Sequence, residues 1–207
     1  MNTSQQIWLV RHGETAWSRS GQHTGRTDLP LLPEAEAELK ALKPHLEHAF
    51  ALVLSSPMQR ARQTASWVGL DNVELDDNLM EWNYGAYEGK TRQEIQKLVP
   101  GWSIFTHGVP GGETLEEVAR RARRVIERAR TASGDVALVS HGHLLRVLAA
   151  CWLDIPPVNA EHFELSAGSV SILGYENDLP VLAQWNWLPD ARRPVAGRSK
   201  SSNTALH

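Results

Sequence analysis

The stretch IWLVRHGET, residues 7–15, decides the fold class. Its first four residues are apolar, and the tripeptide Arg11-His12-Gly13 follows them at once. Such a run is typical of a strand buried inside a sheet, and the glycine marks the start of a loop. The same arrangement recurs at residues 136–142, where the run VALVS ends in His141-Gly142. The two stretches predict two buried strands, each ending in a histidine.

Working outward from these strands, the chain alternates between strand and helix patterns. Residues 34–48 have apolar positions at helical spacing, and Pro57 suits the first turn of a helix reaching about Gly69. We expect loops at residues 15–32 and 79–89, which are rich in glycine and polar or aromatic residues. Two further helices are predicted by capping-box spacing, at Thr91 with Glu94 and at Thr114 with Glu117.

This alternation predicts an α/β fold: a three-layer sandwich with a mainly parallel sheet flanked by helices. Additional strands are predicted at residues 51–54, 170–174 and 181–187. Because ligands bind at the carboxyl ends of parallel strands, the segments that follow three of these strands, RHG, SSP and SHG, are expected to meet at one pocket. We expect a single domain over residues 1–188 and a flexible tail over residues 189–207.

Composition narrows the possible partners. The chain has 207 residues, of which 42% are hydrophobic, enough for a core and unlike a disordered or fibrous chain. With 21 Lys and Arg against 24 Asp and Glu, the net charge of −3 gives no general attraction to nucleic acid or to an anionic membrane. Cys151 is the single cysteine, so no internal disulfide is expected, and the first residues lack the pattern of a signal peptide. These features predict a cytoplasmic protein.

The strand ends and the helix after the second strand carry a set of residues suited to phosphoryl transfer. Arg11 and His12 follow the first strand, Arg60 lies early in the helix after the second, and His141 follows a later strand. A histidine offers a nucleophile, while arginines offer fixed charge for the phosphoryl oxygens. Each residue alone is more often structural, and only the combination is specific.

Five motifs, LVRHGET, SSPMQRARQTA, MEWNYGAYEG, GGETLEEV and LVSHGHLLR, occur in this order between residues 9 and 146. In this they resemble the histidine phosphatase superfamily, also called phosphoglycerate mutase-like. The resemblance implies a sheet flanked by helices, His12 as the nucleophile and Glu81 as the general acid and base. It also implies a phosphate pocket of Arg11, Arg60 and His141.

The resemblance further suggests substrate contacts near the nucleophile. Arg92 is expected to hold a distal acidic group of the substrate, although a surface arginine after the Thr91 cap is the alternative. Backbone N–H groups for the phosphate are expected at Thr24 or Gly25. The full set of expected substrate-binding residues is Ser18, His23, Thr24, Gly25, Trp82, Tyr84, Arg92 and Gly142.

Within the family, the residues of these motifs resemble those of sedoheptulose-1,7-bisphosphatase-like and broad-specificity acid phosphatase members more than those of mutases. Ser18 stands where mutases usually carry Asn, and Trp82 stands where they place a substrate-binding Arg. The resemblance therefore implies a phosphatase that hydrolyses small phosphomonoesters, with sugar phosphates or bisphosphates as the expected substrates, through a phosphohistidine at His12. A phosphoglycerate mutase and a noncatalytic phospholigand-binding domain remain the alternatives.

Two other features have competing interpretations. His141 and His143 have a spacing that metal ligands also use, yet no comparable Asp or His set lies nearby in sequence, so we expect neither a metal nor another cofactor. The arginines between Arg120 and Arg130 are expected to form a solvated helix face, not a nucleic-acid platform, because no aromatic residue interleaves them. A homo-oligomer is possible but nothing in the sequence indicates one.

Overall fold

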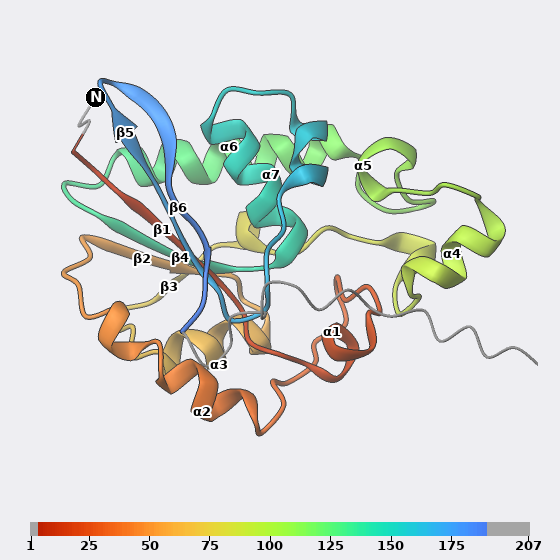
Figure 1. Ribbon diagram of the computed structural model, residues 1–207, viewed down its shortest axis with the longest axis horizontal. Coiled ribbons are helices and arrows are strands. Elements are labelled where there is room, and N and C mark those ends of the chain that lie inside the picture. Colours follow the sequence, from red (N-terminus) through yellow and green to blue (C-terminus); the bar gives the residue numbers. More distant parts are fainter. Residues whose placement is uncertain (1–3, 190–207) are drawn as a thin grey trace, which may run out of the picture.

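The computed structural model describes residues 4–189 and contains one six-stranded sheet between two layers of helices (Figure 1). The strand order is β3-β2-β4-β1-β5-β6. The pairs β3 with β2, β2 with β4 and β4 with β1 are parallel, whereas β5 is antiparallel to both β1 and β6. The strands are β1 (Ile7–Arg11), β2 (Leu52–Ser55), β3 (Glu74–Leu75), β4 (Val136–Ser140), β5 (Val170–Glu176) and β6 (Leu179–Trp187). The predicted α/β class with a mainly parallel sheet is confirmed.

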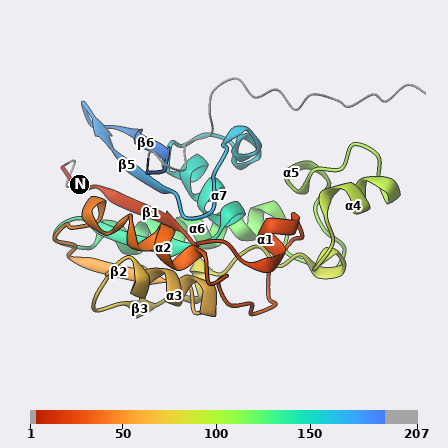
Figure 2. The same cartoon turned by 60° about the horizontal axis from the view of Figure 1, so that its bottom comes forward.

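Helices cover both faces of the sheet. In Figure 1, α6 and α7 lie on one side of the sheet and α2 and α3 on the other, while α4 and α5 extend from one end. The turned view in Figure 2 again shows α4 and α5 at one end of the molecule. The α-helices are α1 (Ala16–Ser20), α2 (Ala35–Lys40), α3 (Gln59–Trp67), α4 (Arg92–Leu98), α5 (Ile104–His107), α6 (Leu115–Arg130) and α7 (Gly142–Trp152). Four 3-10 turns are η1 (Lys43–His45), η2 (Asp77–Leu79), η3 (Gly85–Tyr87) and η4 (Pro157–His162).

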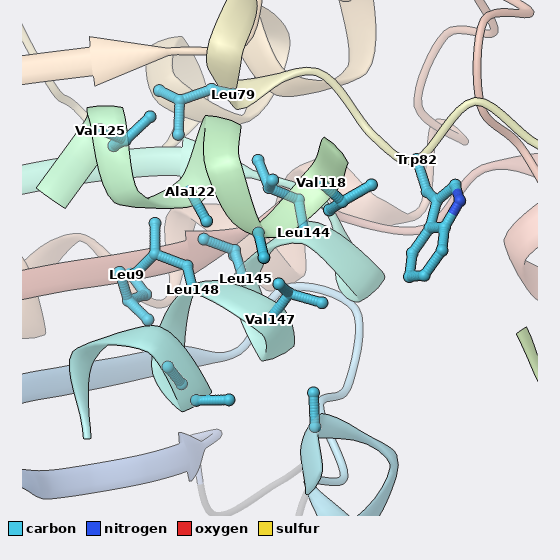
Figure 3. Packing of buried hydrophobic residues seen from close by; sticks show 14 of the residues in the cluster. Leu9, Leu79, Trp82, Val118, Ala122, Val125, Leu144, Leu145, Val147 and Leu148 are labelled. Carbon is cyan, nitrogen blue, oxygen red and sulfur yellow. The ribbon is translucent and has the colours of Figure 1, made fainter. Parts of the chain in front are cut away.

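Alternation of side chains along the central strands gives each helix layer its own core. In β1, Ile7 and Leu9 pack towards α6 and α7, and Trp8 and Val10 pack towards α2 and α3. Figure 3 shows part of the first of these clusters, with Leu9 of β1, Val118, Ala122 and Val125 of α6, and Leu144, Leu145 and Leu148 of α7. A strand buried on both faces reads as a continuous apolar run, which is why residues 7–10 predicted it correctly.

Local sequence explains where two of the predicted helices begin and why two other segments differ from the prediction. Both capping boxes form, with Thr91 and Thr114 each accepting the backbone N–H three residues on. The helix expected over residues 34–48 instead ends at Lys40 and resumes as the turn η1, because Pro44 lacks an N–H and its ring clashes with the preceding turn. The expected loop after Thr15 contains the short helix α1, whose capping box uses Ser18 in place of a Glu.

The tail expected to be flexible lies, except for Pro189, outside the described residues. Among the helices of residues 4–189, none is long and apolar enough to cross a membrane.

Candidate active site

The carboxyl ends of β1, β2 and β4 bring three segments of the chain together. Arg11 is paired with Ser140 in the parallel register, and the backbone N–H of His12 donates to the carbonyl of Ser140 at 2.9 Å. The N–H of Ser56, just after β2, donates to the carbonyl of Val139 at 2.9 Å. These contacts fix the three strand ends side by side, as the RHG, SSP and SHG segments predicted.

His12 is held with one ring nitrogen available. Its Nδ1 lies 2.7 Å from the carbonyl oxygen of Gly13, and since a carbonyl only accepts, Nδ1 carries the proton. Nε2 then has the lone pair. Burial, followed by the charges of Arg60 and Arg11, lowers the pKa of His12 well below its ordinary value, so the ring stays neutral. This tautomer is the one a nitrogen nucleophile needs.

Arg11 has a donor that finds no partner among the described residues. One Nη donates to the carbonyl of Leu165, but Nε is buried and unpaired. Arg11 lies so close to Gly142 that a Cβ on that glycine would stand 3.2 Å from the guanidinium carbon. An unpaired buried N–H of a cation is costly, and an anion bound beside His12 would satisfy it.

Arg60 and His141 are hydrogen-bonded to each other in the protein interior. The side chain of Arg60 is fully buried, and its Nε donates to Nδ1 of His141 at 3.1 Å. Its two Nη atoms donate to the carbonyls of Thr24, Gly25 and Thr27 at 3.0 to 3.2 Å. Of the residues expected to form the phosphate pocket, Arg11 lines the cavity next to His12, whereas Arg60 and His141 are not among its lining residues.

His141 takes the opposite tautomer to His12. Because its Nδ1 accepts from Arg60, its proton is on Nε2, which donates to Oγ of Ser56 at 2.8 Å. Burial, then the charge of Arg60, lowers the pKa of His141 well below its ordinary value. The rings of His12 and His141 lie 5.1 Å apart between centroids.

Glu81 enters the cavity from the loop between η2 and η3. Its Oε1 accepts the N–H of Leu144 at 3.0 Å and of Trp82 at 2.9 Å, and its Oε2 accepts the N–H of His143 at 3.0 Å. Two of these donors belong to the first turn of α7, whose N–H groups have no partner within the helix. The carboxyl group is thus held in place at the wall that His12 also lines.

The cavity next to His12 has a volume of about 180 Å³. Five residues expected to contact substrate line it, namely Ser18, His23, Thr24, Tyr84 and Gly142. Five further lining residues were not predicted, namely Gly21, Gln22, His143, Arg146 and Leu165. His143 was considered only as a metal ligand, although its position two residues after His141 in the first turn of α7 could have indicated it.

A second cavity of about 390 Å³ adjoins the first and shares three wall residues with it, His23, His143 and Arg146. Arg92, the first residue of α4, lines this second cavity. Arg146 donates to the carbonyls of Ala160 and Glu161, and its guanidinium carbon lies 4.8 Å from the centroid of the Phe105 ring. Two arginines therefore face the space beyond the first cavity.

Two expected substrate residues lie elsewhere. The indole of Trp82 is fully buried in the core, at the edge of the cluster in Figure 3, and its N–H donates to the carbonyl of Glu113 at 2.7 Å. The backbone N–H of Gly25 donates to Oε1 of Glu88 at 2.9 Å, so it is not available for a phosphate. The motifs alone do not show which of their residues face the cavity and which face the protein interior.

The histidines near the site are not gathered as metal ligands. Nδ1 of His143 lies 2.6 Å from the hydroxyl of Tyr84, while His141 contacts Arg60 and Ser56. Within residues 4–189, no group of three or more His, Cys, Asp or Glu side chains could hold a metal ion.

Comparison with known proteins identifies the family to which these site residues belong. The sequence model of the histidine phosphatase superfamily (branch 1) matches residues 7–188. The chain belongs to the histidine phosphatase superfamily. The acid phosphatase of Mycobacterium tuberculosis is 38% identical over 185 residues, which cover 87% of this chain and 91% of that protein. The sedoheptulose 1,7-bisphosphatase of Saccharomyces cerevisiae is 34% identical over 184 residues, 71% of this chain and 67% of that one.

Solved structures of this superfamily share the fold. A structure of an open reading frame from Mycobacterium tuberculosis superposes with a TM-score of 0.84 at 35% identity and covers 89% of this chain and 98% of its own. The resemblance expected from the five motifs is confirmed, and the relatives support a phosphoric monoester hydrolase.

Proposed function

We propose that this histidine phosphatase hydrolyses small phosphomonoesters without a metal, through a phosphohistidine at Nε2 of His12. One observation carries the proposal. The lone pair of a neutral buried histidine and the unpaired Nε of Arg11 belong to the same small cavity, and a carboxyl group lines it too. A nucleophile, a fixed cation and an acid are the three groups that phosphoryl transfer needs.

In the first step, Nε2 of His12 attacks phosphorus, a P–N bond forms and the bond from phosphorus to the leaving oxygen breaks. Protonated Glu81 gives its proton to that oxygen. Arg11 stabilises the charge on the phosphoryl oxygens through a planar guanidinium, which suits this role better than a flexible ammonium.

In the second step, water attacks the phosphohistidine, Glu81 takes a proton from the water, and the P–N bond breaks. Phosphate leaves, His12 regains its lone pair and Glu81 regains its proton, so the cycle closes. Arg60 adds positive potential near His12, and its hydrogen bond to Nδ1 keeps His141 in one tautomer.

The two cavities favour a sugar phosphate or bisphosphate as substrate. The two cavities share His23, His143 and Arg146 in their walls, so a substrate with its phosphoryl group beside His12 could extend past His23 and His143 into the second cavity. There Arg92 and Arg146 would attract a distal acidic group. The curated relative from yeast is named for a bisphosphate substrate.

We propose a small phosphorylated metabolite as the partner and the cytoplasm as its setting. Two arginines on the outer side of α6 form ion pairs, which argues against a free platform for nucleic acid. Arg123 pairs with Glu116, and Arg128 pairs with Glu74 and Asp76. The lone Cys151 is compatible with a reducing compartment.

The experiment is a substrate panel in which phosphate release and mutase activity are measured side by side. The panel contains sugar bisphosphates, sugar monophosphates, phosphoglycerates and an aryl phosphate. We expect phosphate release from sugar phosphates together with an acid-labile phosphoenzyme. Phosphoryl transfer between phosphoglycerates without hydrolysis would favour the mutase, and phosphate-ester binding without turnover would favour a noncatalytic domain.

A further inference from the structure

Arg121 is the arginine of α6 that turns inward. Its side chain is 14% exposed, whereas that of Arg123, two residues on, is 47% exposed. Arg121 grips the carboxylate of Glu113 with two parallel bonds, from Nε to Oε1 at 2.7 Å and from Nη2 to Oε2 at 2.9 Å. Such a fork is geometrically specific in a way that a single charge contact is not.

The same guanidinium also holds the loop that carries Glu81. Nη1 donates to the carbonyls of Asn78 at 2.8 Å and Met80 at 2.9 Å, and Nη2 donates to the carbonyl of Glu81 itself at 3.4 Å. Together with the two bonds to Glu113, the five N–H donors of Arg121 meet five acceptors.

Glu113 fixes the other side of the loop. Its Oε2 accepts the backbone N–H of Asn83 at 2.8 Å, and its own N–H donates to the carbonyl of Asn83 at 3.0 Å. Its carbonyl accepts the indole N–H of Trp82 at 2.7 Å. The loop is therefore tied on both sides of Glu81 by one ion pair, which we call the Arg121–Glu113 clamp.

We infer that the Arg121–Glu113 clamp positions Glu81 for proton transfer, so that Arg121 and Glu113 are positioning residues of the reaction. The clamp sets the backbone of Glu81 from α6, while the N–H groups of His143 and Leu144 set its carboxyl group from α7. The inference rests on the proposed role of Glu81 as general acid and base. Proton transfer needs hydrogen-bond reach, and a misplacement of about 1 Å can cost about 10²-fold in rate.

The test uses leaving-group dependence, which a general loss of folded protein would not change. An alkoxide leaving group needs the proton from Glu81, and a nitrophenolate does not. Wild-type protein and Glu81→Gln are assayed first, with a sugar phosphate and a nitrophenyl phosphate, and they test the proposed function alone. If Glu81→Gln shows no selective loss with the sugar phosphate, the proposed acid is wrong whatever Arg121 does.

Arg121→Lys then tests the clamp, since it keeps the charge and loses the fork. We expect its phosphorylation rate with the sugar phosphate to fall about tenfold to 10²-fold, with less than a twofold change for nitrophenyl phosphate. Arg123→Lys, which alters the exposed pair with Glu116 on the same helix, is the matched control and is expected to match wild type with both substrates.

The decisive arm is Arg121→Lys in the Glu81→Gln background. If the clamp acts through Glu81, the added substitution costs nothing further with the sugar phosphate, because the group it positions is already lost. Equal loss with both leaving groups, full additivity in the double variant, or wild-type rates for Arg121→Lys would each overturn the inference. Should Arg121→Lys fail to fold by circular dichroism, Glu113→Gln is judged by the same criteria.

Discussion

The histidines that follow β1 and β4 carry their ring proton on different nitrogens, although the two strands are alike in most other respects. They are parallel neighbours in register, and each is followed by a histidine and a glycine. After β1, Nδ1–H of His12 donates a hydrogen bond to the carbonyl of Gly13, and Nε2 keeps its lone pair. After β4, Nδ1 of His141 accepts a hydrogen bond from Arg60, and its Nε2–H donates one to Oγ of Ser56.

This difference shows that the partner of Nδ1, and not the strand end, decides which histidine can attack. A carbonyl forces a proton onto Nδ1, and a guanidinium N–H keeps a proton off it. His12 therefore presents a nucleophilic nitrogen, and His141 presents a donor that is already engaged. The predictions below are arranged to break or sharpen this contrast.

The largest effect is expected from exchanging the two histidines for alanine. His12→Ala should abolish both turnover and the acid-labile phosphoenzyme, because the lone pair of His12 is the proposed nucleophile and shares the cavity with the unpaired Nε of Arg11. His141→Ala should slow turnover yet still form phosphoenzyme. Radiolabel transfer from a phosphorylated substrate measures both. A phosphoenzyme retained in His12→Ala and lost in His141→Ala would reverse the assignment.

The two arginines should separate activity from stability. Arg11→Ala should lower the phosphorylation rate about 10²- to 10³-fold, as expected for removing a donor to the transition-state oxyanion. Arg60→Ala should cost about 3 kcal/mol or more in the free energy of unfolding, since it leaves buried His141 and three carbonyls without their donor. Rapid quench and urea denaturation give the two quantities. If Arg60→Ala leaves the free energy of unfolding unchanged, its buried bonds are not as described.

Stability should fall as the solution becomes acidic. Burial lowers the pKa of His12, His141 and His143 well below 6.5 in the folded state. Below about pH 6.5 the unfolded chain therefore binds protons that the folded chain does not. The free energy of unfolding should then drop by about 1.4 kcal/mol per pH unit for each histidine until its folded pKa is reached.

Urea denaturation between pH 7.5 and pH 5.0 measures this slope. His143→Gln removes one of the histidines with a lowered pKa and should make the slope shallower by up to about 1.4 kcal/mol per pH unit. A slope that is the same in wild type and His143→Gln would mean that His143 does not titrate differently in the two states.

The smallest effect is expected from removing metals. Phosphate release should be unchanged after dialysis against EDTA, because the proposed reaction draws its charge from Arg11 and its nucleophile from His12. Complete inactivation that added zinc restores would replace the phosphohistidine pathway with a metal-dependent one.

The sequence predicted the strand ends well because their signals are local. An apolar run followed by His-Gly can be recognised from a few consecutive residues. The capping boxes at Thr91 and Thr114 each span only four residues. The register of parallel strands then carries these local segments to one edge of the sheet. His12, Arg11 and Glu81 could be assigned to the cavity on this basis together with the family resemblance.

The rest depends on contacts between distant segments, which no local pattern encodes. The carbonyls of the loop at residues 24–27 hold the guanidinium of Arg60 in its buried position. The carbonyl of Glu113 likewise holds the buried indole of Trp82. The inward turn of Arg121 is hidden among similar arginines of α6, and only its partners on the Glu81 loop distinguish it.

The most direct test of the account is the isomer of phosphohistidine that the enzyme forms. In Glu81→Gln, an aryl phosphate should phosphorylate the enzyme and the dephosphorylation step should be slow, so the intermediate accumulates. Phosphorus NMR of the trapped protein, with peptide mapping by mass spectrometry, identifies both the residue and the nitrogen. The account predicts phosphate on Nε2 of His12. Phosphate on Nδ1 of His12, on His141, or in an acid-stable ester would contradict it.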